Sequence, residues 1–463
     1  MTFRRSPPSR RRRSLFAAVA LIGLAAAGCS NGGTQRSGAA EPDILLILVD
    51  TLRADHLSAY GYVRTTSPFI DGLAARGTLF ESHRAQAPCT FPSANSLLTS
   101  QLPDRFLERI RNEFGIPESI PSIAEILAAR GYSTAAVSAS PIVRANPGRY
   151  NHEGGFGRGF AEFHEDCTWK DASCVNREAL ALGERLDGDA PAFLYLHYID
   201  PHGPYRPPAG FARRYADSSA DAAFPAAVTT GEPSEEARRL DAGQPATVTR
   251  EEIAHWIDLY DDEIAYLDQR VGELIEAVTR WSPQRPLLVA LISDHGESFL
   301  EHGSLAHCRT LFESEIRTPL ILAGPGIPRG RRVRGPSENL DLVPTLLDFA
   351  GIELPAGAFA GRSLRPEIEQ GPEVGSQPQV AFRGTAAAVI DGNFKLIFNR
   401  SGRWRRLYDL AADPDETTDL SRRNRRTVAR LRETFESRHA PGTRAQSSSE
   451  NDAVQELRAL GYL

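Results

Sequence analysis

Three residues at two expected strand ends have side chains that could hold one divalent cation. Asp50 directly follows the apolar run 44–49, and Asp294 and His295 follow the apolar run 286–292 after one serine. Carboxylate oxygens and an imidazole nitrogen suit manganese or zinc, calcium is a third candidate, and a further ligand would have to complete the set. Each aspartate could instead cap a following helix, which is common at strand-to-helix turns. An Asp-His pair at one strand end with an Asp at another favours the metal site.

Histidines are concentrated in the same parts of the sequence. Four of the eleven fall in two short loops after expected strands, namely His202, His295, His302 and His307. Histidine exchanges protons near neutral pH and binds metals. A single histidine is more often a structural hydrogen-bonding residue, but four of them beside acidic residues favour a catalytic role.

Two adjacent nucleophiles lie in the stretch APCTFPSANSLLTS, residues 87–100. The Cys89 thiol or the Thr90 hydroxyl could attack an electrophile once a metal or a base activates it. Thr90 could also be the N-cap of the helix that this stretch is expected to begin. The residue types alone do not choose between these alternatives.

The elements that would position these side chains alternate along the chain. Helix-period segments, such as 122–130 and 250–281, lie between short apolar runs. Nearly continuous apolar runs are typical of strands buried on both faces, as in a parallel sheet. The pattern predicts a doubly wound α/β fold with a mostly parallel central sheet flanked by helices, in which ligands bind at the carboxyl ends of the strands. The expected strands are 44–49, 135–139, 192–198, 286–292 and 319–324.

A second, smaller unit is expected near the C-terminus. The segment 386–399 has the pattern of a hairpin, and a helix is expected over 422–438. We therefore predict a catalytic domain over 42–365 and a C-terminal α+β subdomain over 366–463, with an antiparallel sheet and a helix. The segment 207–248 has no clear periodicity and is interpreted as a surface insertion.

Residues 1–29 have the pattern of an export signal. Six arginines between Arg4 and Arg13 precede an apolar run that is short for a membrane span and ends in Ala-Ala-Gly before Cys29. This end resembles a bacterial lipobox, which predicts a lipidated Cys29 followed by a flexible tether over 30–41. An ordinary cleaved signal and an inner-membrane anchor are the alternatives. The protein is expected in the bacterial cell envelope, facing the periplasm or the cell surface and held to the membrane through the lipid anchor only.

Charge and cysteine content restrict the partners further. The chain has 53 basic and 59 acidic residues, and removal of the signal with its six arginines leaves 47 basic residues and a formal charge of −12. A nucleic-acid partner needs a basic footprint, so this balance argues against one. Four cysteines would remain in an oxidising compartment. Cys167 and Cys174 are close in sequence and are expected to form a disulfide, whereas a bridge between Cys89 and Cys308 is the less favoured pairing.

Ordered motifs along the chain resemble the sulfatase family within the alkaline phosphatase superfamily. They extend over roughly residues 41–430 and include EPDILLILVDTLRADHLSAYGY, TTSPFIDGLAARGTLF, TFPSANSLLTSQLP, FLYLHYIDPHGPYRPP, LISDHGESFLEHGSLAHCRTLFESEIRTPLIL and RRLYDLAADPDETTDL. The resemblance implies the fold of that family and the hydrolysis of a sulfuric or phosphoric ester. It also implies that Asp50, Asp294 and His295 are metal ligands, and that Thr90 is the nucleophile and also contacts the metal.

The resemblance assigns the other histidines as well. His202 and His307 match motif histidines that contact the transferred group or the leaving group, and His302 is expected in a supporting, substrate-binding role. Cys89 lies one residue before the position of the nucleophile, so we expect a structural thiol or a disulfide there.

Three departures from the family pattern affect the expected substrate. The formylglycine signal Cys-x-Pro-x-Arg is absent, because Thr90 occupies the cysteine position and Ala94 the arginine position. The Asp-Asp pair of many sulfatases is Asp50-Thr51, and residues 131–140 lack the Gly-Lys-Trp-His segment that supplies a sulfate-binding lysine. These departures resemble the phosphoryl-transfer branches, which include phosphoethanolamine transferases and polyglycerol-phosphate synthases.

The expected function is an exported, metal-dependent hydrolase that cleaves a sulfate, phosphate or phosphonate ester through a Thr90 ester, with phosphoryl chemistry favoured. The substrate is expected to be a small anionic ester, a glycan or a lipid headgroup. One alternative is a phosphotransferase that modifies an envelope lipid or glycan. Another is an inactive member that binds an anionic glycan.

Overall fold

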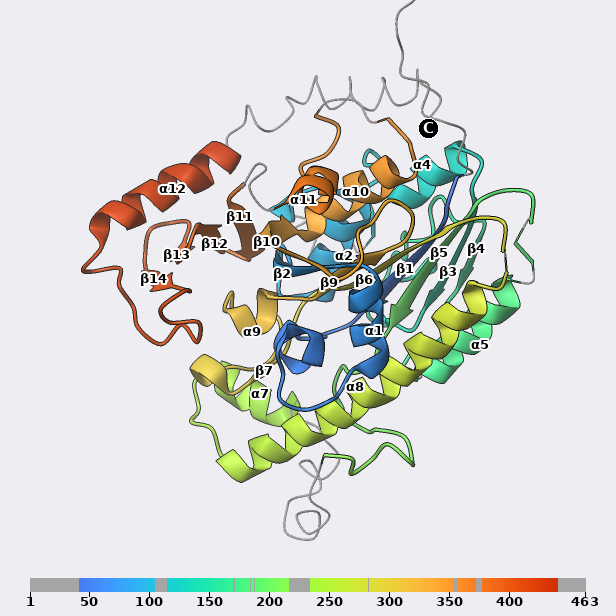
Figure 1. Ribbon diagram of the computed structural model, residues 1–463. Coiled ribbons are helices and arrows are strands. Elements are labelled where there is room, and N and C mark those ends of the chain that lie inside the picture. Colours follow the sequence, from blue (N-terminus) through green and yellow to red (C-terminus); the bar gives the residue numbers. More distant parts are fainter. Residues whose placement is uncertain are drawn as a thin grey trace, which may run out of the picture. The chain divides into compact units, whose positions relative to one another are not determined.

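The described part of the chain is built around an eight-stranded sheet (Figure 1). The structure is a computed structural model that describes residues 41–104, 115–169, 171–183, 185–186, 188–215, 234–281, 283–353, 357–371 and 377–439. The predicted export signal with Cys29, and all but the last residue of the predicted tether, lie outside these residues.

The central sheet confirms the predicted mostly parallel α/β architecture. Its strands follow the order β10-β2-β9-β6-β1-β5-β3-β4, and β9 alone among these eight is antiparallel to its neighbours. The expected strand 319–324 is therefore present, but it runs against the direction of the rest of the sheet. The bounds are β1 Asp43–Val49, β2 Thr78–Arg84, β3 Ser133–Ser138, β4 Glu162–His164, β5 Ala192–Tyr198, β6 Leu287–Ser293, β9 Leu320–Ala323 and β10 Arg331–Glu338.

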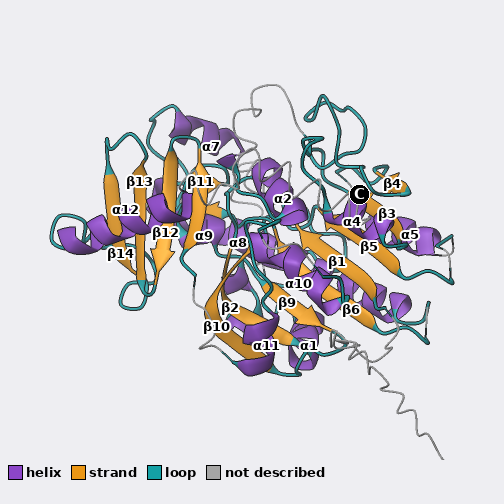
Figure 2. Cartoon of the chain, turned by 90° about the horizontal axis from the view of Figure 1, so that it is seen from above, coloured by secondary structure: helices purple, strands orange, loops and turns teal. Residues whose placement is uncertain are grey.

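Helices cover both faces of this sheet, because its central strands are apolar on both sides. In β1, Leu45 and Ile47 join the core on one face, while Leu46 and Leu48 join the core on the other. Figures 1 and 2 show the two helical layers. One layer contains α1 Pro68–Arg76, α5 Ala172–Gly183 and α8 Arg250–Val278; the other contains α2 Thr90–Thr99, α4 Ile123–Ala129, α10 Leu342–Phe349 and α11 Arg365–Gln370.

The strand order places three polar strand ends side by side. β1 lies between β6 and β5, and Val49 at its end is paired with Ser293 on β6 and with Tyr198 on β5. These pairs are parallel, so the residues that follow the three strands emerge at the same edge of the sheet. The candidate residues after β1, β5 and β6 are thereby brought together.

A four-stranded antiparallel sheet follows in the C-terminal part, in the order β11-β12-β13-β14. The predicted hairpin is present, with Asp391 opposite Phe394 across its turn. Helix α12, Arg425–His439, packs on this sheet through Val428, Leu431 and Phe435. The strands are β11 Gln379–Arg383, β12 Ala386–Asp391, β13 Phe394–Asn399 and β14 Arg405–Asp409.

Helix α11 spans the domain boundary predicted after residue 365. Its Ile368 belongs to the core that lies against the central sheet. The C-terminal sheet is joined to the main sheet through hydrogen bonds: Val380 N donates to Glu338 Oε1 at 2.6 Å, and Phe382 N donates to the Gln86 carbonyl at 2.8 Å.

Short elements complete the described chain near the polar strand ends. β7 and β8 form a two-stranded antiparallel ladder. Within the described residues, no helix combines the length and the apolar character needed to cross a membrane. The remaining elements are β7 Ser298–Phe299, β8 Leu305–Ala306, α7 Ser234–Asp241, α9 Glu313–Ile316 and the 3-10 helices Ala54–His56, Ser58–Tyr60, Glu301–Gly303 and Asn339–Asp341.

Candidate active site

Asp50, Asp294 and His295 lie together at the carboxyl ends of β1 and β6. All three are buried, and one potential ligand atom from each lies within 4.8 Å of the others. His295 Nε2 is 3.7 Å from Asp50 Oδ1 and 3.5 Å from Asp294 Oδ2. The parallel register of β1 with β6 produces this grouping, because both strands end at the same level of the sheet.

The two carboxylates leave buried oxygens without partners. Asp294 Oδ1 accepts the backbone N–H of Thr51 at 3.3 Å and that of His295 at 2.9 Å. Asp294 Oδ2 and Asp50 Oδ1 have no hydrogen-bond partner among the described residues. Burial of an unpaired carboxylate oxygen is costly, and a bound cation removes that cost. These atoms therefore fit a divalent metal ion.

His295 is held in the form that a metal ligand requires. Its Nδ1 donates to the Gly296 carbonyl at 3.0 Å, so Nε2 carries the lone pair that faces the carboxylates. Burial, with a further contribution from His307, lowers the pKa of His295 to about 3, so the ring is neutral. Gly296 is required at this turn, because a Cβ there would lie 2.1 Å from the Ser314 carbonyl oxygen.

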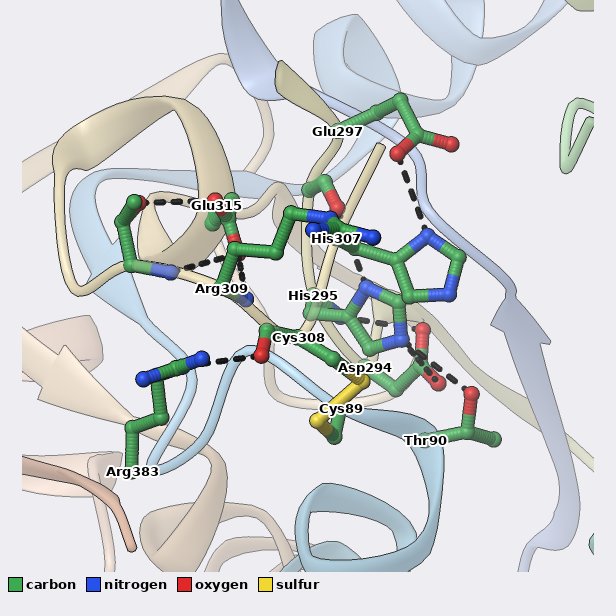
Figure 3. The surroundings of a disulfide bond; sticks show 12 residues. Cys89, Thr90, Asp294, His295, Glu297, His307, Cys308, Arg309, Glu315 and Arg383 are labelled. Atoms are coloured by element: carbon green, nitrogen blue, oxygen red, sulfur yellow. Dashed lines mark hydrogen bonds and ion pairs between the residues drawn. A yellow bond between two sulfur atoms is a disulfide. The ribbon is translucent and has the colours of Figure 1, made fainter. Parts of the chain in front are cut away.

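Thr90 points its hydroxyl at the same group from the first residue of α2 (Figure 3). Thr90 Oγ1 donates to His295 Nε2 at 3.1 Å, and the Thr90 side chain is buried. Its position at a helix N-terminus also favours an anionic group beside it, because unpaired backbone N–H groups point outward there. Thr90 is thus the side chain of the pair 89–90 that faces the predicted metal ligands.

Cys89 and Cys308 form a disulfide. The expectation from the sequence that this pairing is the less favoured one is therefore wrong. The bridge forms because the chain around residue 308 runs beside the chain before Thr90: Cys308 N donates to the Pro88 carbonyl at 2.8 Å. The thiol is therefore not a free nucleophile. The structure also joins Cys167 to Cys174.

His307 lies beside His295, and His202 lies beside His307. The His307 ring centroid is 4.7 Å from that of His295 and 4.8 Å from that of His202. Burial would lower the pKa of His307, but the buried Glu297 carboxylate, 3.1 Å from Nδ1, raises it to about 9. His307 is therefore a cation at neutral pH. His202 Nδ1 donates to the Gly203 carbonyl at 2.6 Å, which leaves its Nε2 for a substrate.

His302 lies outside this group. It is an exposed residue with φ of 54°, and its ring stacks on Phe312 with the centroids 3.6 Å apart. Partial covering of its ring, followed by the charge of Lys395, lowers the pKa of His302. The structure thus does not bring His302 together with His202 and His307. Its predicted supporting role in substrate binding stays a prediction.

Two further residues lie at the site, and neither was predicted from the sequence. His197 on β5 places Nε2 3.6 Å from Asp50 Oδ2, and Glu297 pairs with His307. A histidine inside the otherwise apolar run 192–198, on a strand expected beside β1, is the signal that could have indicated the first. The signal for Glu297 is its position two residues after His295, in the same loop.

Comparison with known proteins gives the same assignment along the chain. The sequence model of the sulfatase family matches residues 42–352, and that of the C-terminal region of N-sulphoglucosamine sulphohydrolase matches residues 301–440. The chain is 29% identical to the choline-sulfatase of Rhizobium meliloti over 446 residues, which cover 84% of each protein. It is 24% identical to the arylsulfatase of Clostridium perfringens, over 82% of this chain and 90% of that one.

Solved structures share the fold. The phosphonate monoester hydrolase of Agrobacterium radiobacter is 21% identical and has a TM-score of 0.68, over 88% of this chain and 96% of that one. A protein solved in complex with its substrate D-glucosamine-2-N,6-O-disulfate is 18% identical and has a TM-score of 0.66, over 89% of this chain and 99% of that one.

Proposed function

The chain belongs to the sulfatase family of ester hydrolases, and from that membership we propose that it is an exported, metal-dependent hydrolase that cleaves a phosphate, phosphonate or sulfate ester through a covalent ester on Thr90. Phosphoryl transfer is the favoured chemistry. One observation carries the proposal: the Thr90 hydroxyl lies at a buried group of two carboxylates and a neutral imidazole, while the neighbouring thiol is held in a disulfide.

A divalent ion bound by Asp50, Asp294, His295 and Thr90 Oγ1 would lower the pKa of the Thr90 hydroxyl and neutralise charge on the transferred group. Two carboxylates, an imidazole and a hydroxyl suit manganese or zinc, and calcium is the third candidate. The unpaired oxygens of Asp50 and Asp294 are the atoms that support this assignment.

The chain's own residues supply the remaining chemistry. Thr90 Oγ1 releases its proton to solvent and attacks the central phosphorus or sulfur atom, and the bond from that atom to the leaving oxygen breaks with its electron pair on that oxygen. His307, cationic through Glu297, holds the non-bridging oxygens of the transferred group. His202 Nε2 takes up a proton from solvent and gives it to the leaving oxygen, which departs as the alcohol; such a proton transfer typically contributes about 10²–10⁴-fold. Water then cleaves the Thr90 ester and restores the hydroxyl.

The residues around Thr90 support phosphoryl rather than sulfuryl transfer. The cysteine that formylglycine formation requires is replaced by Thr90, and Cys89 is bonded to Cys308. Ala94, at the position where the formylglycine signal has arginine, is fully buried and carries no charge.

Export and a lipid anchor at Cys29 are part of the proposal. All four cysteines within the described residues are in disulfides, which persist in oxidising compartments outside the cytosol. Fractionation of cells that express the full chain or Cys29→Ser tests the anchor. We expect the variant to leave the membrane fraction, and an unchanged distribution would refute the lipidation.

The catalytic proposal is tested with paired aryl substrates. The purified protein is assayed with an aryl phosphate monoester, phosphate diester, phosphonate monoester and sulfate, each with manganese, zinc or calcium. We expect Thr90→Ala to lose at least about 10³-fold of turnover and Thr90→Ser to retain part of it. Thr99→Ala is the matched control, because Thr99 lies in the same helix and its hydroxyl bonds the Asn95 carbonyl.

Each outcome of this assay decides one part of the proposal. Acid quenching of the reaction with the phosphate substrate should trap a phosphorylated peptide that contains Thr90. Unchanged turnover in Thr90→Ala would refute the nucleophile, and turnover of the sulfate alone would refute the preference for phosphoryl chemistry. A product formed on added glycerol in place of phosphate release would identify the protein as a phosphotransferase.

A further inference from the structure

The Cys89–Cys308 disulfide joins the two loops that carry opposite sides of the proposed site (Figure 3). Cys89 immediately precedes Thr90, and Cys308 immediately follows His307. The two cysteines are 219 residues apart in sequence, and their Cα atoms are 4.8 Å apart. The bridge is thus a covalent connection between the residue before Thr90 and the residue after His307.

The loop that carries His307 needs such a connection. Ala306 and Cys308, on either side of His307, have φ values of 65° and 66°, a left-handed conformation that non-glycine residues adopt at an energetic cost. A strained backbone of this kind persists only where the surrounding structure holds it in place. β8 holds one end of the loop through its ladder with β7.

The other end of the loop is fixed at Cys308. Besides the disulfide, Cys308 N donates to the Pro88 carbonyl at 2.8 Å, and Arg383 Nε donates to the Cys308 carbonyl at 2.8 Å. Pro88 is itself next to Cys89. The disulfide and the hydrogen bond to Pro88 therefore both attach the His307 loop to the residues directly before Thr90, the first residue of α2.

We propose that the Cys89–Cys308 disulfide is a positioning element of the reaction, which fixes the His307 imidazole relative to the Thr90 hydroxyl so that both can act on one transferred group. Both side chains contact His295: Thr90 Oγ1 lies 3.1 Å from its Nε2, and the centroids of the His307 and His295 rings are 4.7 Å apart. The inference rests on the proposed function of Thr90. A displacement of about 1 Å at a reacting group can cost about 10²-fold in rate, so removal of the bridge should be seen in catalysis as well as in stability.

The second disulfide provides a matched control. Cys167 and Cys174 are seven residues apart and close a loop before and into α5, and they join neither the Thr90 turn nor the His307 loop. Cys167→Ala/Cys174→Ala therefore removes a disulfide without removing the proposed connection.

The experiment compares the full-length wild-type protein, Cys89→Ala/Cys308→Ala and the control variant, each loaded with manganese. The readouts are kcat and KM for an aryl phosphate and the Kd of orthovanadate, which adopts the trigonal-bipyramidal geometry of phosphoryl transfer. For Cys89→Ala/Cys308→Ala we expect kcat to fall by about 10²-fold, vanadate Kd to rise by a similar factor, and KM to change by less than about threefold. The control opens the loop that carries Trp169, whose ring centroid is 5.5 Å from that of His202, so it should change kcat and vanadate Kd by less than about tenfold.

A second measurement covers the case in which Cys89→Ala/Cys308→Ala does not fold. The control variant retains Cys89–Cys308 as the one disulfide among the described residues, so a phosphine reductant applied to this folded protein opens that bridge. We expect kcat and vanadate binding to be lost on reduction and restored on reoxidation, while the circular dichroism spectrum is retained. Alkylation and peptide mass analysis verify which cysteines were opened.

The outcomes separate this inference from the proposed function. If the bridge is removed and kcat and vanadate Kd stay within about threefold of the control, the inference is overturned and the hydrolase proposal stands. If the wild type turns over none of the esters but its vanadate Kd rises on opening the bridge, the inference stands and the proposed hydrolysis fails. Absence of both ester turnover and vanadate binding in the wild type, with manganese, zinc or calcium, would overturn both.

Discussion

Replacement of Asp294 by asparagine should abolish metal binding and yet stabilise the metal-free protein. The Asp294 carboxylate is fully buried, and its two oxygens have different surroundings. Oδ1 accepts two backbone N–H groups, whereas Oδ2 has no partner among the described residues and lies 3.5 Å from His295 Nε2. Asparagine can place its carbonyl oxygen at the Oδ1 position and its amide at the Oδ2 position. Both backbone hydrogen bonds then survive, and the negative charge is removed.

The size of the gain follows from the distance between the two carboxylates. Ligand atoms of Asp50 and Asp294 lie within 4.8 Å of each other. Two unit charges at that separation repel by about 3.5 kcal/mol at an effective dielectric constant of about 20. Burial, and then the charge of Asp50, raises the pKa of Asp294, so proton uptake already relieves part of this repulsion. We therefore expect Asp294→Asn to raise the free energy of unfolding of the metal-free protein by about 1–3 kcal/mol.

Metal should reverse the order of stability. An ion at a free concentration of 100 times its Kd stabilises a protein that binds it by about 2.7 kcal/mol, and it adds nothing to a variant that does not bind it. Differential scanning calorimetry in EDTA should show Asp294→Asn melting above the wild type. A manganese titration should raise the Tm of the wild type past that of the variant, which should have no measurable turnover.

Asp341 is the matched control, because it is also a buried aspartate but uses both oxygens. Its Oδ1 accepts Arg362 N at 2.9 Å and its Oδ2 accepts Glu338 N at 2.9 Å. Asparagine must turn its amide towards one of these donors, so Asp341→Asn should lose about 1–3 kcal/mol with or without metal and keep the metal response. The reasoning is refuted if Asp294→Asn is as destabilised as Asp341→Asn in EDTA, or if manganese still raises its Tm.

Three further predictions concern buried titratable groups. Glu297→Gln removes the buried partner of His307, so vanadate Kd in the manganese-loaded protein should rise by about tenfold or more, with Glu276→Gln on exposed α8 surface as the control. His83, bonded to Ser337 and Asn339, has its pKa lowered by burial to about 3 from an unfolded value of 6.5. Between these two pKa values only the unfolded chain takes up this proton. The free energy of unfolding should therefore fall as the pH drops from 6.5 towards 3, by at most about 1.4 kcal/mol per pH unit. Urea denaturation at a series of pH values should show that the free energy of unfolding of His83→Gln depends less steeply on pH than that of the wild type. Lys395 is fully buried between Glu313 at 2.8 Å and Glu416 at 2.9 Å, so Lys395→Met should cost about 3–5 kcal/mol in urea denaturation. The exposed pair Arg430–Asp391 is the contrast, since Arg430→Ala should cost less than about 1 kcal/mol, and equal losses for the two variants would contradict the burial argument.

The central sheet could be predicted where apolar runs reveal buried strands. β1, β5 and β6 are nearly continuous apolar segments, and the structure buries them on both faces. β2 and β10 were not predicted, because TLFESHR and RRVRGPSE mix charged and apolar residues, and β10 is an edge strand of the sheet. The direction of β9 could not be predicted either, since an apolar run of four residues buried on both faces has no feature that depends on strand direction.

The spacing of the histidines did not predict which of them meet. His302 and His307 are five residues apart, yet one stacks on Phe312 and the other lies over His295. Residues in the left-handed conformation lie before and between them: Leu300, His302, Gly303 and Ala306 all have positive φ. These turns reverse the chain between β7 and β8, and no residue type in EHGSLAH specifies them, because glycine occupies only one of the positive-φ positions.

Backbone geometry at the start of α2 decides which of the two neighbouring side chains faces the carboxylates and which forms the disulfide. Cys89 has an extended backbone, with φ of −141° and ψ of 141°, and Thr90 begins the helix. Side chains of successive residues in extended backbone point to opposite sides. Cys89 therefore faces the loop of Cys308, and Thr90 faces His295. A cysteine one residue later would lie at the carboxylates and could not form this disulfide. The one-residue offset of Cys89 from the family's cysteine position therefore places the thiol in the bridge to Cys308 and away from the carboxylates.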